Sequence, residues 1–317
     1  MEDKSPQNVE LANSLVRQLI KENRSAKRWK NIRFFLGLAF VAFLTLFFIS
    51  SNHTLVDVNG DNTKGYAAVI KLDGMIGPGQ GFSAEEVLPL LKDAFTDESA
   101  QGVILDINSG GGTPVQASII HDAIIKLKNQ YHKKVIVVGE DMLASGAYYV
   151  AVAADKIYVN PNTITGSIGV IMKGFGFPDV IKKIGVERRV YASGEYKDRL
   201  DSFLPQNKED IDKIRQVIGE VHNNFNQVVL QGRAGKLHAD AKTLFTGDFW
   251  SGQTALTLGL VDGLGNLLDV LQNEFHVSRY KDYSQNQAML KNLISQLGAS
   301  LDLALGQGEM KVLTQME

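Results

Sequence analysis

The chain contains no cysteine, which excludes disulfide bonds, thiol catalysis and cysteine metal sites. This absence is compatible with an exported bacterial domain. The six histidines are scattered and form no metal-ligand spacing: His53, His121, His132, His222, His238 and His276. The sequence therefore predicts neither a metal site nor a cofactor.

Charge of neither sign predominates, because 33 Lys and Arg stand against 35 Asp and Glu for a formal net charge of −2. The distribution is uneven, since residues 1–33 hold eight basic and four acidic side chains and the remaining residues hold 25 and 31. A mildly acidic main body is not typical of a surface that binds the phosphate backbone. We therefore expect no nucleic-acid partner.

Long apolar runs are also scarce, and the one example covers residues 34–49. With Ser50 and Ser51 it approaches the ~20 residues that a helix needs to cross a bilayer. A cleaved signal peptide is the rival interpretation, but its apolar stretch is typically ~7–15 residues within the first ~30. A buried soluble helix is disfavoured because no polar face interrupts the run. The favoured prediction is an uncleaved anchor over residues 34–51.

Basic residues crowd the N-terminal side of this run, whereas residues 50–62 contain neither lysine nor arginine. The positive-inside rule then predicts a cytoplasmic head over residues 1–33 and export of residues 52–317. We expect a single-pass protein of the bacterial inner membrane, with a linker over residues 52–65. The lipid bilayer is thus an expected partner.

Strand and helix signals alternate from residue 66 onward, which is typical of an α/β domain. We expect this domain to span residues 66–275 and a polar tail, with one amphipathic helix over residues 285–305, to occupy residues 276–317. Predicted strands cover residues 66–72, 102–107, 135–138, 156–159, 169–172 and 188–192. Predicted helices cover residues 83–94, 114–129, 145–153, 178–184, 207–233, 251–258 and 267–274.

Two predicted strands lead to glycine turns that open helices. The first turn is Gly110-Gly111-Gly112, and the second places Ser145 directly before Gly146. Glycine allows close backbone approach, and helix starts carry unpaired N–H groups, so the two turns could form an oxyanion hole beside a nucleophile. In isolation, however, such a turn is usually only a turn, and such a serine usually only a helix cap.

A serine hydroxyl becomes a good nucleophile only when a neighbouring base takes its proton. None of the histidines lies in a glycine-flanked setting comparable with that of Ser145. A desolvated lysine is the recognised substitute, and Lys197 follows Ser145 by 52 positions. A carboxylate facing this amine would keep it protonated, so we expect Asp198 to point away from it.

Five segments, in this order, resemble signatures of the signal peptide peptidase A (protease IV) family, and the last of them is especially similar to the motif of SohB-type members. They read INSGGG (107–112), ASGAYY (144–149), GSIGV (166–170), GEYK (194–197) and TGDFWSGQ with GLVD (246–253 and 259–262). The resemblance runs from about residue 66 to residue 274, and the order and spacing of the motifs make it specific. One departure is Gly110, which stands where the family usually has proline.

The resemblance implies a Clp protease/crotonase-type fold of repeated ββα units and the activity of a serine endopeptidase. It implies Ser145 as nucleophile, Lys197 as general base, Gly112 and Gly146 as oxyanion N–H donors, and Ser167 as the residue that orients the lysine amine. Family members with one catalytic unit form membrane-anchored homo-oligomers, in which the lysine can serve its own or a neighbouring subunit's serine. The implied substrates are membrane-derived peptides, chiefly cleaved signal peptides.

Two other functions stay open on the sequence alone. An acyl-CoA enzyme of the crotonase type would use the same oxyanion architecture, but a membrane anchor and a serine–lysine pair have no purpose there. A catalytically silent scaffold that binds peptides or organises membrane partners is the second, and the presence of both Ser145 and Lys197 speaks against it.

Overall fold

The structure is a computed structural model that describes residues 29, 32–40, 43, 55–58 and 65–284. The chain divides into two compact units, Met1–Thr54 and Leu55–Glu317. In the first unit, residues 32–40 are helical. None of the helices in the described part of the chain has the length and apolar character that a bilayer crossing requires. Most of the predicted head, most of the predicted anchor and the whole predicted helix over residues 285–305 lie outside the described residues.

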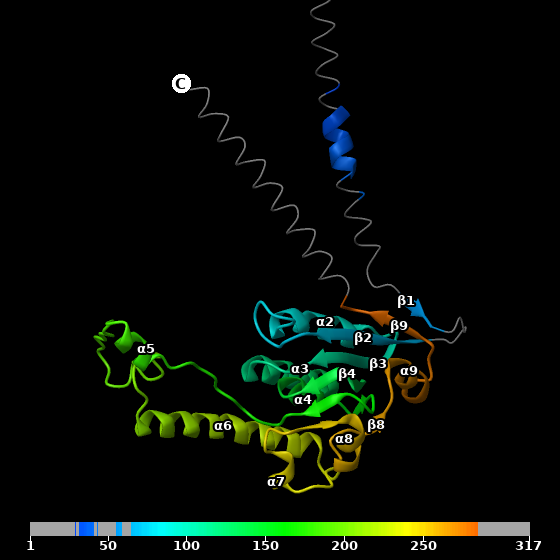
Figure 1. The fold of residues 1–317 in the computed structure, drawn as a ribbon. Coiled ribbons are helices and arrows are strands. Elements are labelled where there is room, and N and C mark those ends of the chain that lie inside the picture. The colour runs from blue at the N-terminus through cyan, green and yellow to red at the C-terminus, as the bar shows by residue number, and fades with distance from the viewer. Residues whose placement is uncertain (1–28, 30–31, 41–42, 44–54, 59–64, 285–317) are drawn as a thin grey trace, which may run out of the picture. The chain divides into compact units, whose positions relative to one another are not determined.

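The second unit is built on one mixed sheet of nine strands in the described part of the chain (Figure 1). Its strand order is β1-β9-β2-β3-β4-β5-β8, and β6 pairs with β4 and with β7. Neighbouring strands are parallel except for the antiparallel pairs β1–β9 and β6–β7. The strands are β1 Leu55–Asp57, β2 Tyr66–Asp73, β3 Ala100–Ser109, β4 Lys134–Ala144, β5 Lys156–Val159, β6 Ile164–Gly166, β7 Phe249–Ser251, β8 Gly263–Leu264 and β9 Arg279–Asp282.

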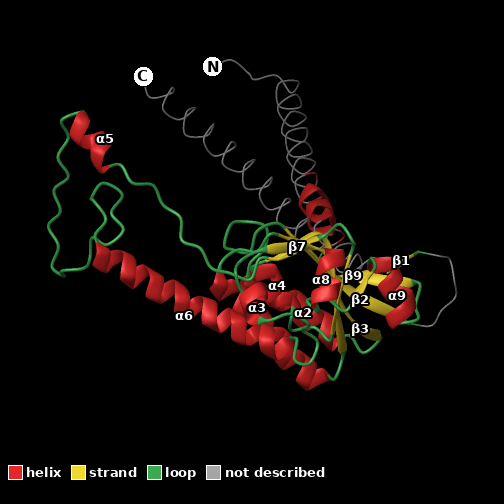
Figure 2. Cartoon of the chain, turned by 60° about the horizontal axis from the view of Figure 1, so that its bottom comes forward, coloured by secondary structure: helices red, strands yellow, loops and turns green. Residues whose placement is uncertain are grey.

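Helices follow most strands, which confirms the expected α/β class (Figure 2). Ser83 and Glu86 form the predicted capping box at the start of α2, and Pro114 is the first residue of α3. Thr113 precedes α3 as its cap residue but makes no side-chain capping bond. The helices are α2 Ala84–Thr96, α3 Pro114–Tyr131, α4 Gly146–Ala151, α5 Pro178–Lys183, α6 Lys208–Gly232, α7 Ala241–Leu244, α8 Gly252–Leu258 and α9 Leu267–Glu274.

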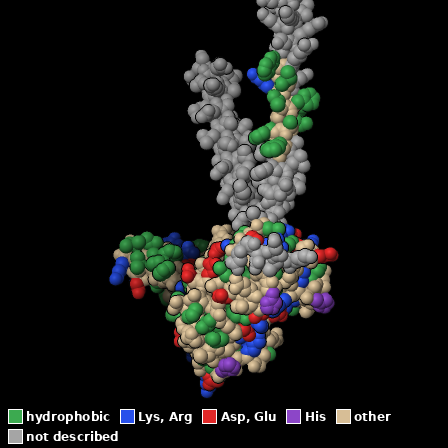
Figure 3. Space-filling model, turned by 90° about the vertical axis from the view of Figure 1, so that its right-hand side faces the viewer, with side chains coloured by type: hydrophobic (Ala, Val, Ile, Leu, Met, Phe, Trp, Pro, Cys, Tyr) green, Lys and Arg blue, Asp and Glu red, His purple; other side chains and the backbone are tan. Residues whose placement is uncertain are grey.

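The central strands are apolar on both faces because each face is covered. One core cluster joins side chains of β2, β3 and β4, such as Leu105, to those of α2, α3, α4 and α6. A smaller cluster on alternate residues of the same strands, such as Ile104, packs against α9. On the face drawn in Figure 3, acidic and basic side chains are interspersed. The unit therefore presents the carboxyl ends of β3 and β4 on a rigid, fully packed support.

The strand that leads to Ser145 is longer than predicted. β4 continues from the predicted residues 135–138 through a register irregularity opposite Ile107 and Ser109 and ends at Ala144. The predicted strand over residues 169–172 is absent, and β6 lies a few residues earlier, parallel to the end of β4. The predicted strand over residues 188–192 is also absent. Both errors arose because short β-rich runs without a neighbouring strand cannot make ladder hydrogen bonds.

Two strands lie in segments that were predicted as linker and tail. β1 falls within residues 52–65, and β9 falls within residues 276–317 and pairs with β2. Burial alone would raise the pKa of Asp97, but hydrogen bonds from Tyr283, Tyr66 and Lys281 lower it well below its usual range. This cluster fastens the end of α2 to β2 and to the β9 segment. The packed sheet thus extends beyond both predicted ends of the domain, into the predicted linker and the predicted tail.

Candidate active site

Ser145 lies between the last residue of β4 and the first residue of α4, in a strained backbone conformation. Its φ of 54° and ψ of −123° are rarely adopted by a residue with a side chain. The turn is held on both sides, because the Ser145 N–H donates to the Gly166 carbonyl at 2.8 Å and the Tyr149 N–H donates to the Ser145 carbonyl at 2.9 Å. A strained serine at a sharp strand-to-helix turn is the arrangement that exposes a nucleophilic hydroxyl.

The glycine turn after β3 packs directly against this serine. A Cβ atom on Gly111 would lie 2.7 Å from Ser145 Cβ and 2.6 Å from the Gly146 nitrogen, and the φ of Gly111 is +98°. A Cβ atom on Gly112 would lie 2.1 Å from the Ile76 carbonyl oxygen. At Gly110 the nearest atom would be the flexible Cε of Met142, at 3.3 Å. Glycine is therefore required at the second and third positions of the turn, but not at the first.

The two predicted oxyanion donors are neighbours. The Ile76 N–H donates to the Gly111 carbonyl, and the Ile76 carbonyl accepts from the Thr113 N–H. In such a parallel bridge the N–H of Gly112, between these two residues, faces away from Ile76. Gly146 is the first residue of α4, where N–H groups have no acceptor within the helix. An ideal Cβ on Gly146 would lie 3.1 Å from the Gly112 nitrogen, so both N–H groups belong to one small region beside Ser145.

Ser167 is brought next to Ser145 by strand pairing. Because Ala144 pairs with Gly166 in the parallel β4–β6 ladder, the residues that follow them leave the sheet side by side. Ser167 is half-buried, has a φ of 51° and donates its N–H to the Asp248 carbonyl at 2.8 Å. The structure thus places the predicted orienting serine at the same sheet edge as the predicted nucleophile.

An apolar cleft of about 300 Å³ opens beside Ser145 and Gly112. Its walls come from the start of α3, from α4, from residues 169–171 and from the middle of α6. Phe225 is buried, and its ring lies 5.1 Å from that of Tyr149, which also lines the cleft. This arrangement can hold an apolar side chain next to the serine hydroxyl while an extended peptide lies along the turn.

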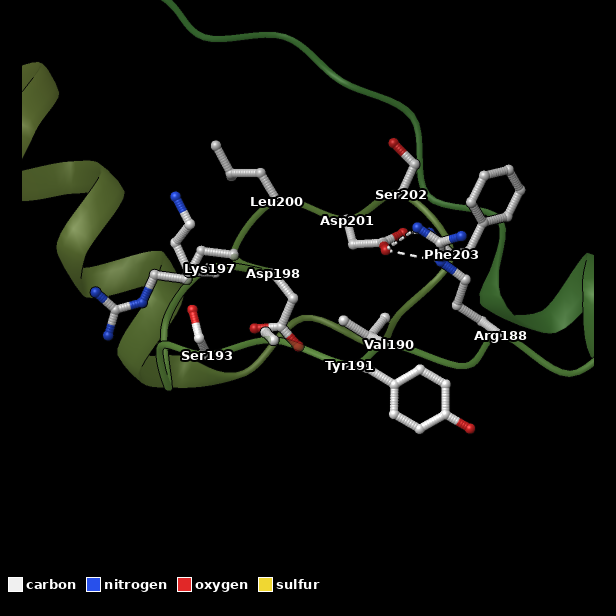
Figure 4. Close-up of a pocket in the computed structure, with 12 residues that line it drawn as sticks. Arg188, Val190, Tyr191, Ser193, Lys197, Asp198, Leu200, Asp201, Ser202 and Phe203 are labelled. Atoms are coloured by element: carbon white, nitrogen blue, oxygen red, sulfur yellow. Dashed lines mark hydrogen bonds and ion pairs between the residues drawn. The ribbon is translucent and has the colours of Figure 1, made fainter.

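Lys197 does not line this cleft. It is exposed and belongs to the long connection between β6 and α6, where it borders a separate open cavity of about 690 Å³ with Arg188, Tyr191 and Phe203 among others. Figure 4 shows the Lys197 side chain and the Asp198 carboxylate pointing to different sides of their loop, as expected for Asp198. The structure of one chain therefore assembles Ser145, Gly112, Gly146 and Ser167, but not Lys197.

Comparison with known proteins identifies the family of the chain. The model of peptidase family S49 matches residues 127–276, a range that contains Ser145, Ser167 and Lys197. A putative protease of Synechocystis sp. is 32% identical over 211 residues, which cover 67% of this chain and 74% of that protein. The chain belongs to peptidase family S49.

Other relatives are longer than the matched region. A putative signal peptide peptidase SppA of Enterococcus faecium is 31% identical over 192 residues, 61% of this chain and 55% of that protein. A Brucella melitensis protein named Na(+)/H(+) antiporter NhaA is 46% identical over 213 residues, 65% of this chain but 29% of that protein. The chain thus covers about half or less of the length of these two curated relatives.

The β6–α6 connection of this S49 chain carries an unusual amount of exposed apolar surface. No side chain from residue 171 to residue 206 is buried. Phe175 stacks on Phe177 with ring centroids 6.2 Å apart, and the tilted ring of Phe203 lies 5.9 Å from that of Phe177. Tyr191 is 92% exposed. Exposed aromatic side chains that contact one another are typical of an interface.

Sequence reasoning missed three features of the site. Gly111 was read only as part of a turn, although its missing side chain allows the contact with Ser145. Tyr149 and Phe225 were not recognised as cleft residues, because their roles depend on how α4 and α6 pack rather than on a local motif. The one available signal for Phe225 was its position on the apolar face of the predicted helix over residues 207–233.

Proposed function

We propose that this S49 chain is a serine endopeptidase in which Ser145 is the nucleophile. The observation that carries the proposal is the strained Ser145 turn with Gly111 packed against it, beside two N–H groups that face one region. Attack of the Ser145 hydroxyl on a peptide carbonyl produces an oxyanion and, after loss of the amine, an acyl-enzyme. The N–H groups of Gly112 and Gly146 stabilise the oxyanion, and water then releases the second product.

The general base in this proposal is Lys197 of another copy of the chain. Two observations support this: Lys197 is exposed and outside the Ser145 cleft, and it lies on the apolar β6–α6 connection. Packing of this connection against a second copy would cover the exposed aromatic side chains and desolvate the amine. Desolvation lowers the pKa of a lysine, which is what a proton acceptor near neutral pH requires. Ser167 then orients the amine toward the Ser145 hydroxyl.

The proposed substrates are membrane-derived peptides, chiefly cleaved signal peptides. The apolar lining of the cleft by Tyr149, Phe225 and Val115 supports this choice. The apolar run over residues 34–49, with its basic flank, supports a membrane anchor with the catalytic unit outside the cytoplasm. The anchor would keep the enzyme near peptides released from a bilayer, and the apolar cleft would bind their side chains.

Cleavage of an apolar, internally quenched peptide tests the proposal. Wild-type protein should cleave it, and Ser145→Ala should reduce turnover by about 10³-fold or more without unfolding the protein. Lys197→Arg should be as inactive as Lys197→Ala, because a guanidinium does not give up its proton at these pH values. Cleavage retained by Ser145→Ala would refute the nucleophile. Binding without cleavage by the wild type would instead support the scaffold function.

A further inference from the structure

The turn that carries Lys197 has a defined shape of its own. The Lys197 N–H donates to the Gly194 carbonyl at 3.2 Å, and a Cβ atom on Gly194 would lie 3.0 Å from Lys197 Cγ, so the lysine stem lies against this glycine. Three residues later, Leu200 has a φ of 74°, which a residue with a side chain rarely adopts. Because no side chain from residue 171 to residue 206 is buried, contacts at the surface must hold this turn in place.

Arg199 fastens the Lys197 turn to the first turn of α6. Its Nε lies 2.6 Å from Asp210 Oδ1, and its Nη2 lies 2.9 Å from Glu209 Oε1. The guanidinium carbon lies 3.8 Å from the centre of the Tyr196 ring, so one arginine joins the residue before Lys197 to the helix. The side chains of Arg199 and Asp210 are only 19% and 18% exposed, so solvent ions screen this pair less than an open surface pair. These three contacts form the Arg199 clamp.

Arg188 holds a further carboxylate on the other side of the turn. Its Nη2 lies 2.8 Å from Asp201 Oδ2, and the Phe203 N–H donates to Asp201 Oδ1 at 2.9 Å. The Phe203 N–H and then the Arg188 guanidinium lower the pKa of Asp201 below its usual range. Figure 4 shows the Asp201 carboxylate turned toward Arg188 and the Lys197 amine pointing away from this pair.

The carboxylates around Lys197 are thus paired or directed elsewhere. Asp198 and Asp201 line the same cavity as Lys197, but Asp201 is paired and Asp198 points to another side of the loop. Glu195 hydrogen-bonds the neighbouring tyrosine, and the two carboxylates of α6 are both held by Arg199. A carboxylate that faced the amine would stabilise its charged form and so weaken it as a proton acceptor.

We propose that Arg199 is a positioning residue for Lys197: it fastens the turn of the general base to α6 and keeps two carboxylates of this helix from pairing with the lysine amine. The inference rests on the proposed function, because it presupposes that Lys197 is the base. α6 also lines the cleft beside Ser145 with Phe225, so the clamp links the base that a chain offers to its neighbour with the helix at its own serine. The amine then reaches its site in a fixed place and without a carboxylate partner.

Two variants break the clamp, and only one of them releases carboxylates. Arg199→Ala leaves Glu209 and Asp210 without their arginine, whereas Glu209→Gln/Asp210→Asn removes the clamp and the carboxylates together. For the full-length enzyme and the apolar, internally quenched peptide, both should lower kcat about 10-fold with KM within about twofold, because the Ser145 cleft is unchanged. In Arg199→Ala alone, the rise of activity with pH should also move about one pH unit higher, since the released carboxylates favour the charged amine.

Three further variants make the comparison specific. Arg199→Lys keeps a charge beside the carboxylates but loses the forked and stacked contacts, so kcat should fall less than in Arg199→Ala and the pH rise should stay near that of wild type. Lys128→Ala removes an ion pair of 2.7 Å between α3 and Asp155, and should leave kcat and the pH profile unchanged. Arg199→Gln, which releases the same carboxylates but keeps a polar side chain, replaces Arg199→Ala if that variant does not fold. Kinetics are compared where sedimentation shows the same assembly as for wild type.

Three results would overturn the inference. Wild-type kcat in folded Arg199→Ala would show that the clamp does not position the base. A fall in kcat without the shift to higher pH would leave Arg199 a structural role only, and an equal shift in Glu209→Gln/Asp210→Asn would show that released carboxylates are not its cause. Loss of cleavage in Ser145→Ala and in Lys197→Ala reports separately on the proposed function, so failure of the inference and failure of that function are distinguishable.

Discussion

At the scale of single residues, the site depends on the lack of side chains in the glycine turn as much as on the side chains around it. The strained backbone of Ser145 is possible because Gly111 leaves space for the serine Cβ and for the Gly146 nitrogen. Gly110, where the related family usually has proline, has only a flexible methionine end nearby. The first glycine of the turn thus tolerates a side chain, whereas Gly111 and Gly112 do not.

These tolerances give a prediction with a built-in control. Gly111→Ala should lower turnover by about 10²-fold or more, because its methyl group pushes Ser145 and the Gly146 N–H out of line. Gly110→Ala should keep turnover within about threefold of wild type, since Met142 can move aside. Both variants should be compared by circular dichroism and by cleavage of the apolar, internally quenched peptide. Near-normal turnover in folded Gly111→Ala would show that the turn has no part in catalysis.

The raised pKa of Asp106 predicts how the stability of the folded protein changes with pH. Burial of this β3 side chain and then the charge of Glu140 cause the rise. The folded pKa of about 7 lies above that of an ordinary unfolded aspartate, near ~3.9, so the folded state binds the proton more tightly. Its contribution to stability is present below about pH 4 and is lost as the pH rises through 7. The full loss corresponds to at most about 4 kcal/mol.

Asp106→Asn removes this ionisation while it keeps the shape of the side chain. The variant should therefore be more stable than wild type at pH 8, by about 1–3 kcal/mol, and this advantage should shrink toward pH 5. Urea unfolding of both proteins at the two pH values, with Glu98→Gln as the charge control, measures the difference. A constant offset between wild type and variant across this range would contradict the raised pKa.

At the scale of secondary-structure elements, local chemistry predicted much of the fold. The capping box at Ser83 and the proline at position 114 predicted where α2 and α3 begin, buried apolar runs located β3 and the first part of β4, and shorter β-rich runs located β2 and β5. Pairing between distant strands was not predictable from such signals. β6, β7, β8 and β9 contain two to four residues each. Each exists because a partner strand forms hydrogen bonds with its backbone N–H and C=O groups.

The same distinction applies to the site. The motifs around Ser145, Gly112 and Ser167 pointed to one edge of the sheet, and the β4–β6 register brings Ser145 and Ser167 together there. The sequence could not show that Lys197 lies outside the cleft, because its position depends on a long connection without strands. It also could not show the acidic surroundings of Asp106, because residues of three strands contribute to them.

At the scale of the whole molecule, the β6–α6 connection separates the predicted base from the predicted nucleophile and exposes aromatic side chains along its length. A head-to-tail contact between copies would cover this surface and complete each site with a lysine from a neighbour. Such heterologous contacts close into rings when the rotation between subunits permits it. One chain of this S49 peptidase would then be inactive alone, and assembly would switch on catalysis.

Mixing two inactive variants tests this central claim most directly. Ser145→Ala keeps its lysine, and Lys197→Ala keeps its serine, so only a site shared between copies can combine both groups. After co-refolding or co-expression at equal amounts, random head-to-tail pairing should restore about one quarter of the wild-type cleavage rate. Each variant alone should stay inactive. Mixed oligomers, verified by two affinity tags, that show no cleavage above the single variants would contradict the shared site.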